Sequence, residues 1–181
     1  MSDIDLAKKT QIHVLRKTIR EIASLKLMET KTSFIETGKP KDQSYISVMA
    51  STLPNKCNPG DYLIYIFRVV GGNESNRNKI YENFTKLREK EDGRALCQYN
   101  KLSNILYIGR SKNLRARFKQ HLGDGPVGTY AMHMKHWIDG INLKIEFTYY
   151  RFSGSSDRAL QALEDGLWDR LDPMFGKRGA K

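Results

Sequence analysis

Residues 107–121 bring a tyrosine, an arginine and a histidine together at spacings that suit the binding of an anion. Tyr107 lies in an apolar run, residues 105–108, that is compatible with a β-strand and stops at Gly109. An amphipathic helix follows a short turn. Arg117 and His121 stand four residues apart in it, so they share one edge of the helix. This pattern predicts a site for an anionic substrate, and the alternative is a basic, solvated helix after a strand.

The same segment is rich in positive charge, and so is the whole chain. The further candidates for contacts with nucleic acid are Arg110, Lys112, Arg115 and Lys119. A net charge of +11 and a pI of about 9.6 favour an anionic partner, with nucleic acid first and an anionic membrane surface second. Because no apolar run reaches membrane-spanning length and the N-terminus shows no secretion signal, we expect a cytoplasmic or nucleoid-associated bacterial protein that is not secreted.

A carboxylate in the predicted C-terminal helix is the second candidate for chemistry. The apolar stripe of that helix consists of Leu160, Leu163, Leu167 and Leu171. Glu164 falls inside the stripe, where its charge loses solvation unless an arginine or a metal ion compensates for it. The sequence leaves two hypotheses open, a metal ligand and a structural glutamate in an ion pair at the rim of the stripe.

Other residue types that bind metals are too few to form a site. Cys57 and Cys97 cannot build a disulfide framework or a four-ligand zinc site, so we expect two reduced thiols. His133 and His136 are three residues apart on a predicted helix, but no further ligand stands nearby at a suitable spacing. The sequence therefore does not predict a zinc centre.

The elements that must position these residues follow from hydrophobic periodicity and turn signals. We predict an N-terminal helix over residues 3–28, a linker over 30–60 with at most one short element, strands at 62–70, 104–108 and 143–150, helices after residue 73, after residue 113 and at 129–138, and a final helix from Asp157. The predicted organisation is an arm and linker at 1–60 and a domain at 61–181 with an insertion at about 71–102. The N-terminal helix is expected to pack on the domain, and the alternative is an arm that contacts DNA or forms a dimer.

Two motifs on the predicted strands resemble the signature of the GIY-YIG nuclease superfamily. Residues 107–109 read Tyr-Ile-Gly, the second half of the signature, and Arg117 and His121 follow at the family's spacing. Residues 63–67 resemble the first half, with Tyr65 at the tyrosine position and a leucine where the family has glycine. An alternative alignment uses Gly60 as the family glycine, but it places a charged residue inside the strand.

The C-terminal helix resembles the closing motif of the same family. Residues 159–164 end in Glu164, and Pro173 follows nine residues later. Gly176 stands where many members carry an asparagine. The resemblance covers residues 62–176, and it leaves the N-terminal part and the long spacer between the two halves of the signature unexplained.

The resemblance implies a fold and a chemistry. The implied fold class is α+β, with a small three-stranded antiparallel sheet flanked by helices, an N-terminal helix and a helical insertion between strands one and two. The implied activity is that of a divalent-metal-dependent DNA endonuclease. In it, Glu164 binds Mg²⁺ or Mn²⁺, Arg117 contacts the phosphate, Tyr65 or Tyr107 positions or deprotonates the water, and His121 relays the proton.

Several alternatives to this function remain open in the sequence. The first alternative is a catalytically silent module of the same fold that only binds DNA. The second is a structural or interaction protein whose basic charge serves RNA or ribosome binding. Among active enzymes, a restriction or defence role is weighed evenly against a repair or mobile-element nuclease. A homodimer is also left open.

Overall fold

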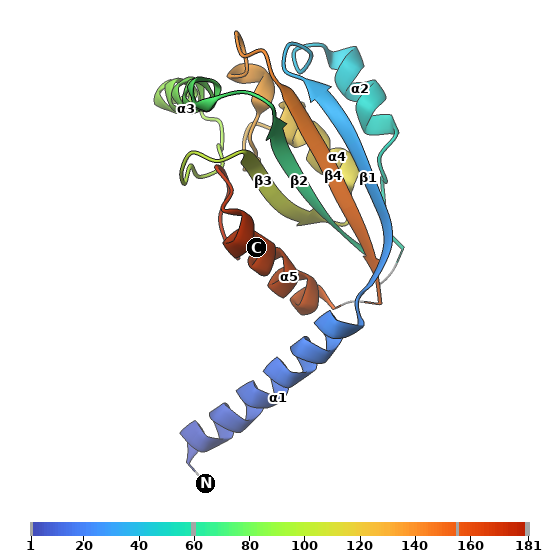
Figure 1. The fold of residues 1–181 in the computed structure, drawn as a ribbon. Coiled ribbons are helices and arrows are strands. Elements are labelled where there is room, and N and C mark those ends of the chain that lie inside the picture. The colour runs from blue at the N-terminus through green and yellow to red at the C-terminus, as the bar shows by residue number, and fades with distance from the viewer. Residues whose placement is uncertain (1, 59–60, 155, 180–181) are drawn as a thin grey trace.

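The computed structural model describes residues 2–58, 61–154 and 156–179, and its centre is a four-stranded antiparallel sheet (Figure 1). The strands are β1 (Lys26–Glu36), β2 (Tyr62–Val70), β3 (Ile105–Ser111) and β4 (Lys144–Ser153), in the order β1-β4-β2-β3. The predicted α+β class is confirmed. The prediction of three strands is wrong, because β1 adds a fourth to the sheet.

β1 escaped the sequence prediction because it lies at the edge of the sheet and buries little. It pairs with β4 along its whole length, from Lys26 opposite Ser153 to Glu36 opposite Lys144. Ile35 is the buried residue in its burial pattern, and most of the other side chains are exposed. A strand held mainly by backbone hydrogen bonds needs no alternation of apolar residues, so periodicity could not reveal it.

β2 is the central strand that its continuous apolar sequence predicts. Tyr65 and Phe67 belong to a core cluster on one face of the sheet, whereas Ile64 and Ile66 belong to a second cluster on the other face. Both faces of the strand are therefore covered, which explains why apolar residues occupy consecutive positions instead of alternate ones.

Helices cover the two faces unequally (Figure 1). The helices are α1 (Asp3–Ser24), α2 (Gln43–Ser51), α3 (Glu74–Glu89), α4 (Leu114–Leu122) and α5 (Asp157–Leu171). Buried residues of α2, α3 and α4 join the larger core cluster, and α5 supplies Leu160 to the smaller one. Because β3 is an edge strand with α4 following it in sequence and α5 packed against it, side chains from both faces can meet around its free edge.

Two helix predictions and the linker prediction need correction. The N-terminal helix ends at Ser24 because the chain continues into β1. The predicted linker, in which at most one short element was expected, contains both α2 and the second half of β1. The helix predicted at 129–138 is reduced to a 3-10 turn at Met134–His136, since His133 adopts a left-handed backbone with φ of 49° that interrupts an α-helix. The division of the chain into two domains at residue 60 stays a prediction, and Gly60 itself lies outside the described residues.

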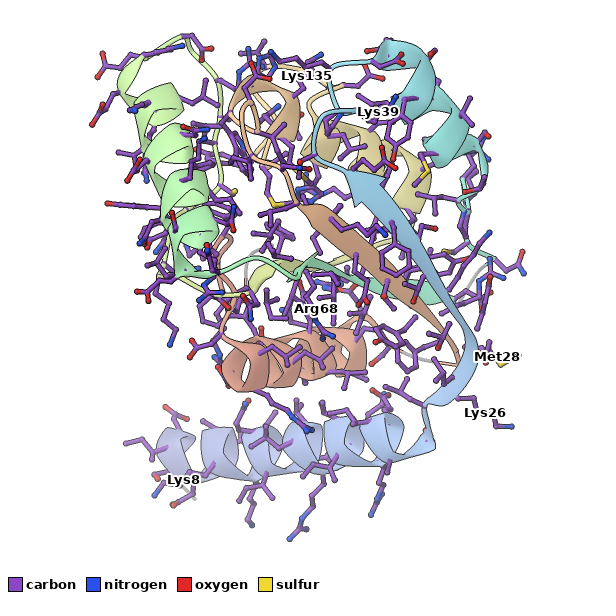
Figure 2. The ribbon with its side chains drawn as sticks, turned by 45° about the horizontal axis from the view of Figure 1, so that its top comes forward. Lys8, Lys26, Met28, Lys39, Arg68 and Lys135 are labelled. Carbon is purple, nitrogen blue, oxygen red and sulfur yellow. The ribbon has the colours of Figure 1, made fainter. Side chains whose placement is uncertain are left out.

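α1 projects from the rest of the molecule and touches it along α5 (Figures 1 and 2). Thr18 is its buried residue, and five large aliphatic side chains remain about half exposed or more. Among the helices of the described residues, none is both long and apolar enough to cross a membrane.

Candidate active site

The two signature tyrosines lie side by side on adjacent strands. Tyr65 on β2 faces Gly109 of β3 in the antiparallel register, and Tyr107 faces Phe67. The two tyrosine rings are nearly parallel, with centroids 6.2 Å apart. A Cβ atom at Gly109 would stand 2.5 Å from the Tyr65 hydroxyl oxygen and 2.8 Å from Cε1 of Tyr107. Glycine at this position is therefore a steric requirement of the tyrosine pair.

Arg117 holds both tyrosine hydroxyls. Its Nε donates to the Tyr65 oxygen at 3.1 Å, and Nη2 donates to the Tyr107 oxygen at 3.2 Å. Nη1 donates to Oε1 of Gln120 at 3.0 Å. The helix that carries Arg117 is fixed by its own sequence, because Asn113 caps its first turn by accepting from the Ala116 N–H.

The amphipathic character predicted for this helix is also present in the structure. Leu114, Phe118 and Leu122 are buried against the sheet. Their burial sets the rotation of α4 about its axis, so Arg117 is directed at the tyrosines.

His121 has a single defined hydrogen-bonding state. Its Nδ1 accepts the backbone N–H of Met132 at 3.3 Å, so the ring proton resides on Nε2, which lies 3.1 Å from the Tyr65 oxygen. The histidine is fully buried, and burial together with the Arg117 charge lowers its pKa well below the usual value. His121 is thus a neutral donor to Tyr65. This geometry favours a positioning role over the predicted proton relay.

The Tyr65 oxygen therefore accepts two hydrogen bonds, one from Arg117 and one from His121. Burial raises the pKa of Tyr65 above its ordinary value, and the Arg117 charge opposes that shift. Burial also raises the pKa of Tyr107, which Arg117 contacts through one donor. In this structure both groups are phenols at neutral pH.

A cleft of about 1200 Å³ opens beside these residues. Tyr65, Tyr107 and Arg117 line it from one side, and Glu164 lines it from α5. The basic residues that line it are Arg88, Arg110, Lys112, Arg117 and Lys177. Four of the five predicted catalytic residues thus share one basic cavity, and His121 lies behind Tyr65.

Glu164 is paired with an arginine, as one of the two sequence hypotheses required. Its Oε2 lies 3.1 Å from Nε of Arg110, and its side chain is 14% exposed. Burial raises the pKa of Glu164 to about 7, and the Arg110 charge opposes the shift without cancelling it. The carboxylate is therefore easily protonated near neutral pH unless a further cation stabilises it.

The surroundings of Glu164 fit a divalent ion that has this one carboxylate as its protein ligand and takes its remaining ligands from water and the substrate. Its Oε1 has no hydrogen bond or ion pair to any residue that the structure describes. Within residues 2–58, 61–154 and 156–179, no group of three or more acidic, histidine or cysteine side chains is arranged so that it could hold a metal ion. A single carboxylate completed by water and phosphate oxygens is a mode that suits Mg²⁺.

The four residues predicted to contact nucleic acid lie in different settings. Arg110 is bound to α5, and the Lys112 ammonium lies 4.6 Å from the centre of the Tyr62 ring at the cleft. Lys119 stands 3.7 Å from Asp124. Arg115 donates to the main-chain carbonyls of Ser51 and Leu53, and this geometry favours a structural role in holding the end of α2.

Three functional candidates came from the structure alone. Arg88, at the end of α3, and Lys177 line the cleft, and Asn100 donates to the carbonyls of Pro173 and Gly176 at 3.2 Å each. Arg88 and Asn100 belong to the spacer between the two halves of the signature, where no motif position marked either residue individually. Gly176 lies against the Tyr107 ring, because a Cβ atom added at Gly176 would stand 3.1 Å from Cε2 of Tyr107.

Comparison with protein-family models finds a match, described as the GIY-YIG catalytic domain, over residues 97–176. Residues 97–176 are therefore similar to GIY-YIG catalytic domains. The resemblance inferred from the motifs is confirmed, and the domain points to a nuclease. Comparisons with curated proteins and with solved structures return no match.

The GIY-YIG match covers β3, α4 and α5 but begins after β2. Tyr65 therefore lies outside it. The pairing of β2 with β3 places Tyr65 beside Tyr107, with the two rings nearly parallel. The structure thus supports the alignment that centres the motif on Tyr65.

Proposed function

We propose that this GIY-YIG protein is a divalent-metal-dependent endonuclease that hydrolyses DNA phosphodiester bonds in the basic cleft beside β3. The observation that carries the proposal is the placement of Arg117. It holds the hydroxyls of Tyr65 and Tyr107 and lines the same cavity as Glu164. A cation, a pair of phenols and an acidic metal ligand around one basic cavity are the components that phosphodiester hydrolysis needs.

Arg117 is suited to bind the scissile phosphate. A guanidinium carries five N–H donors, and three of them are engaged by Tyr65, Tyr107 and Gln120. Two donors, one on each Nη atom, remain for the non-bridging oxygens of a phosphate. Because the other three bonds fix the plane of the group, its orientation is set before the substrate arrives.

Tyr65 is better placed than Tyr107 to act on the attacking water. As a phenol Tyr65 can only orient the water, and to take the water's proton it must first release its own proton to solvent in the cleft and become a phenolate. Its oxygen accepts bonds from both Arg117 and His121, and both donors favour the phenolate. Tyr107 has one such donor among the described residues, so it is assigned to orienting Arg117 and the phosphate. His121 holds Tyr65 Oη in position through Nε2.

Glu164 is the residue that would hold the metal ion, Mg²⁺ or Mn²⁺, through its Oε1. Such an ion, when bound, polarises the phosphate and stabilises the charge on the leaving oxygen. Lys112 and Lys177 add positive charge along the cleft, where the DNA backbone would pass.

The deciding experiment is incubation of the protein with supercoiled plasmid, branched DNA and single-stranded DNA in the presence of Mg²⁺. Glu164→Ala should lose at least about a hundredfold in cleavage rate, since a metal contributes several kcal/mol to the transition state. Asp169→Ala is the matched control, because Asp169 lies on the same helix and pairs with Arg178 in an exposed position.

Cleavage that survives EDTA, or that Glu164→Ala leaves intact, contradicts the proposal. DNA binding without cleavage by the wild-type protein would support the catalytically silent module instead. Mapping of the ends separates the roles, because fixed sequences at the ends favour a restriction enzyme and cuts at branches favour a repair enzyme.

A second copy of this chain is the partner that we propose for α1. The helix exposes an aliphatic stripe that consists of Ile4, Ile12, Leu15 and Ile19, which are 48–67% exposed. Its first turn is acidic, with Asp3 and Asp5, and Arg16 and Arg20 lie toward its other end. Two antiparallel copies would bury the stripes against each other and bring each acidic end near the basic residues of the other, a self-complementary arrangement.

The oligomeric state tests this contact. Light scattering should give a dimer for the wild-type protein and a monomer for the double variant Ile12→Glu/Ile19→Glu. A monomeric wild-type protein at micromolar concentration would contradict the proposed dimer without affecting the nuclease proposal.

A further inference from the structure

Arg110 is held against the carboxylate of Glu164 by several residues of α5. It follows Gly109 on β3, and its side chain is 18% exposed. Nε lies 3.1 Å from Glu164 Oε2, and Oε1 of Gln161 accepts from Nε at 3.2 Å and from Nη2 at 2.8 Å. Nη1 pairs with Asp157. The sequence suggested a free phosphate contact, but the guanidinium is anchored beside the proposed metal ligand.

This arrangement has a consequence for a metal ion at Glu164. The carboxylate already has a cationic partner on Oε2, so an ion on Oε1 would lie close to a second positive charge. The metal ion and the Arg110 guanidinium are both positive, and two like charges on either side of one carboxylate repel strongly in a partly buried site. A phosphate placed in the cleft adds negative charge between them and removes most of that repulsion.

We propose that Arg110 is a positioning residue that makes metal binding at Glu164 depend on the presence of a substrate phosphate. The inference rests on the proposed function, because it takes Glu164 as the metal ligand. Without a phosphate, Arg110 pairs with Glu164 and weakens its attraction for a divalent ion. With a phosphate in the cleft, the guanidinium of Arg110, which faces Glu164 through Nε, is shared with the phosphate, and the ion and the substrate bind cooperatively.

The anchors of Arg110 explain how it can release Glu164 without leaving the site. Asp157 and Gln161 contact the guanidinium independently of Glu164, and Gln161 is itself oriented by a bond to Asp165 Oδ1 at 3.0 Å. The group is therefore kept at the edge of the cleft in either state. Because coupling between two ligands is reciprocal, the metal ion should raise the affinity for the phosphate by the same factor.

The test measures Mn²⁺ affinity by electron paramagnetic resonance, with and without thymidine 3′,5′-bisphosphate, a probe that has no phosphodiester to cleave. The wild-type protein should bind Mn²⁺ more tightly when the probe is present. Arg110→Gln should bind Mn²⁺ at least about tenfold more tightly than wild type without the probe, and the probe should then add little. Arg110→Lys retains the charge and should behave nearly as the wild-type protein does.

Controls separate this inference from the proposed function. Arg158→Gln removes one charge from an exposed position of α5, the helix that carries Glu164, outside the residues that line the cleft, and it should change the Mn²⁺ affinity by less than about threefold. If Arg110→Gln does not fold, Gln161→Leu loosens the same guanidinium and should tighten Mn²⁺ binding by a smaller factor.

Equal Mn²⁺ affinities of the wild type, Arg110→Gln and Gln161→Leu would overturn the gating role, while a loss of binding in Glu164→Gln would still support the metal ligand. Unchanged Mn²⁺ binding in Glu164→Gln would overturn the metal assignment and the gating role together.

Discussion

Gly109→Ala tests whether the tyrosine pair depends on the absence of a side chain in β3. The new methyl group would stand 2.5 Å from the Tyr65 hydroxyl oxygen, 2.7 Å from Cζ of Tyr65 and 2.8 Å from Cε1 of Tyr107, whereas ordinary contacts begin at 3.4 Å. Tyr65 would have to retreat by about 1 Å. It is 1% exposed and surrounded by other rings, so little space is available for the movement.

Overpacking of this kind costs about 1–3 kcal/mol, and for a chain of this size it should lower the melting temperature by about 3–10 °C. Displacing a catalytic oxygen by about 1 Å should reduce the cleavage rate by about a hundredfold. The measurements are thermal unfolding and plasmid nicking. Gly128→Ala is the control, because a Cβ atom there meets nothing within 4 Å, and it should change neither value.

A double mutant then distinguishes the clash from a general loss of stability. Tyr65→Leu removes the two nearest atoms, so the combination with Gly109→Ala should be less destabilised than the sum of the single variants by about 1 kcal/mol. Additive effects, or a Gly109→Ala protein with wild-type melting and cleavage, would refute the steric argument.

Three further predictions follow from the site and from α1. Arg117→Lys should still bind DNA but cleave it poorly, because one ammonium cannot hold two phenols and a phosphate, and normal cleavage would refute the bidentate role. The pKa of Glu164 is raised to about 7 in the folded protein, so the folded state accommodates the neutral carboxyl better than the carboxylate, by about 3 kcal/mol. The folded state therefore has this full advantage below about pH 4.5, where the group is neutral, and loses it as the pH rises through about 7. Urea unfolding at pH 5 and pH 8 should therefore show Glu164→Gln gaining stability relative to wild type at the higher pH, and a constant difference would contradict the assignment. Deletion of residues 1–24, which stops before β1, should leave a folded monomer with a weaker salt dependence of DNA binding, and an unfolded product in a thermal melt would show that α1 is needed by the core.

Local patterns in the sequence were sufficient for the elements that bury a regular apolar face. The continuous run of β2, the stripe of α4 and the stripe of α5 each have a period that one secondary structure satisfies, and the structure contains all three. The spacing relative to those stripes predicted Glu164 inside the apolar stripe of α5 and Arg117 along one edge of α4. These conclusions needed no knowledge of neighbouring elements.

Elements stabilised by partners far away in the chain were not predictable in the same way. β1 is held by its pairing with β4, more than a hundred residues later, and its own side chains are largely exposed. The helix expected at 129–138 fails because His133 turns the backbone, which hydrophobic spacing does not record. Contacts between distant segments decide these cases, and a periodic pattern reports only on its own segment.

The sequence by itself determined the residue types of the site and their order, because tyrosine, arginine and glutamate occupy motif positions on elements with clear periodicity. Only the tertiary structure decided what each of them touches. The antiparallel register sets Tyr65 beside Tyr107, the bond from Met132 fixes the proton of His121 on Nε2, and the packing of α5 on β3 joins Arg110 to Glu164. Hydrogen bonds act over about 3 Å, so they depend on how distant elements pack, and spacing along the chain cannot specify them.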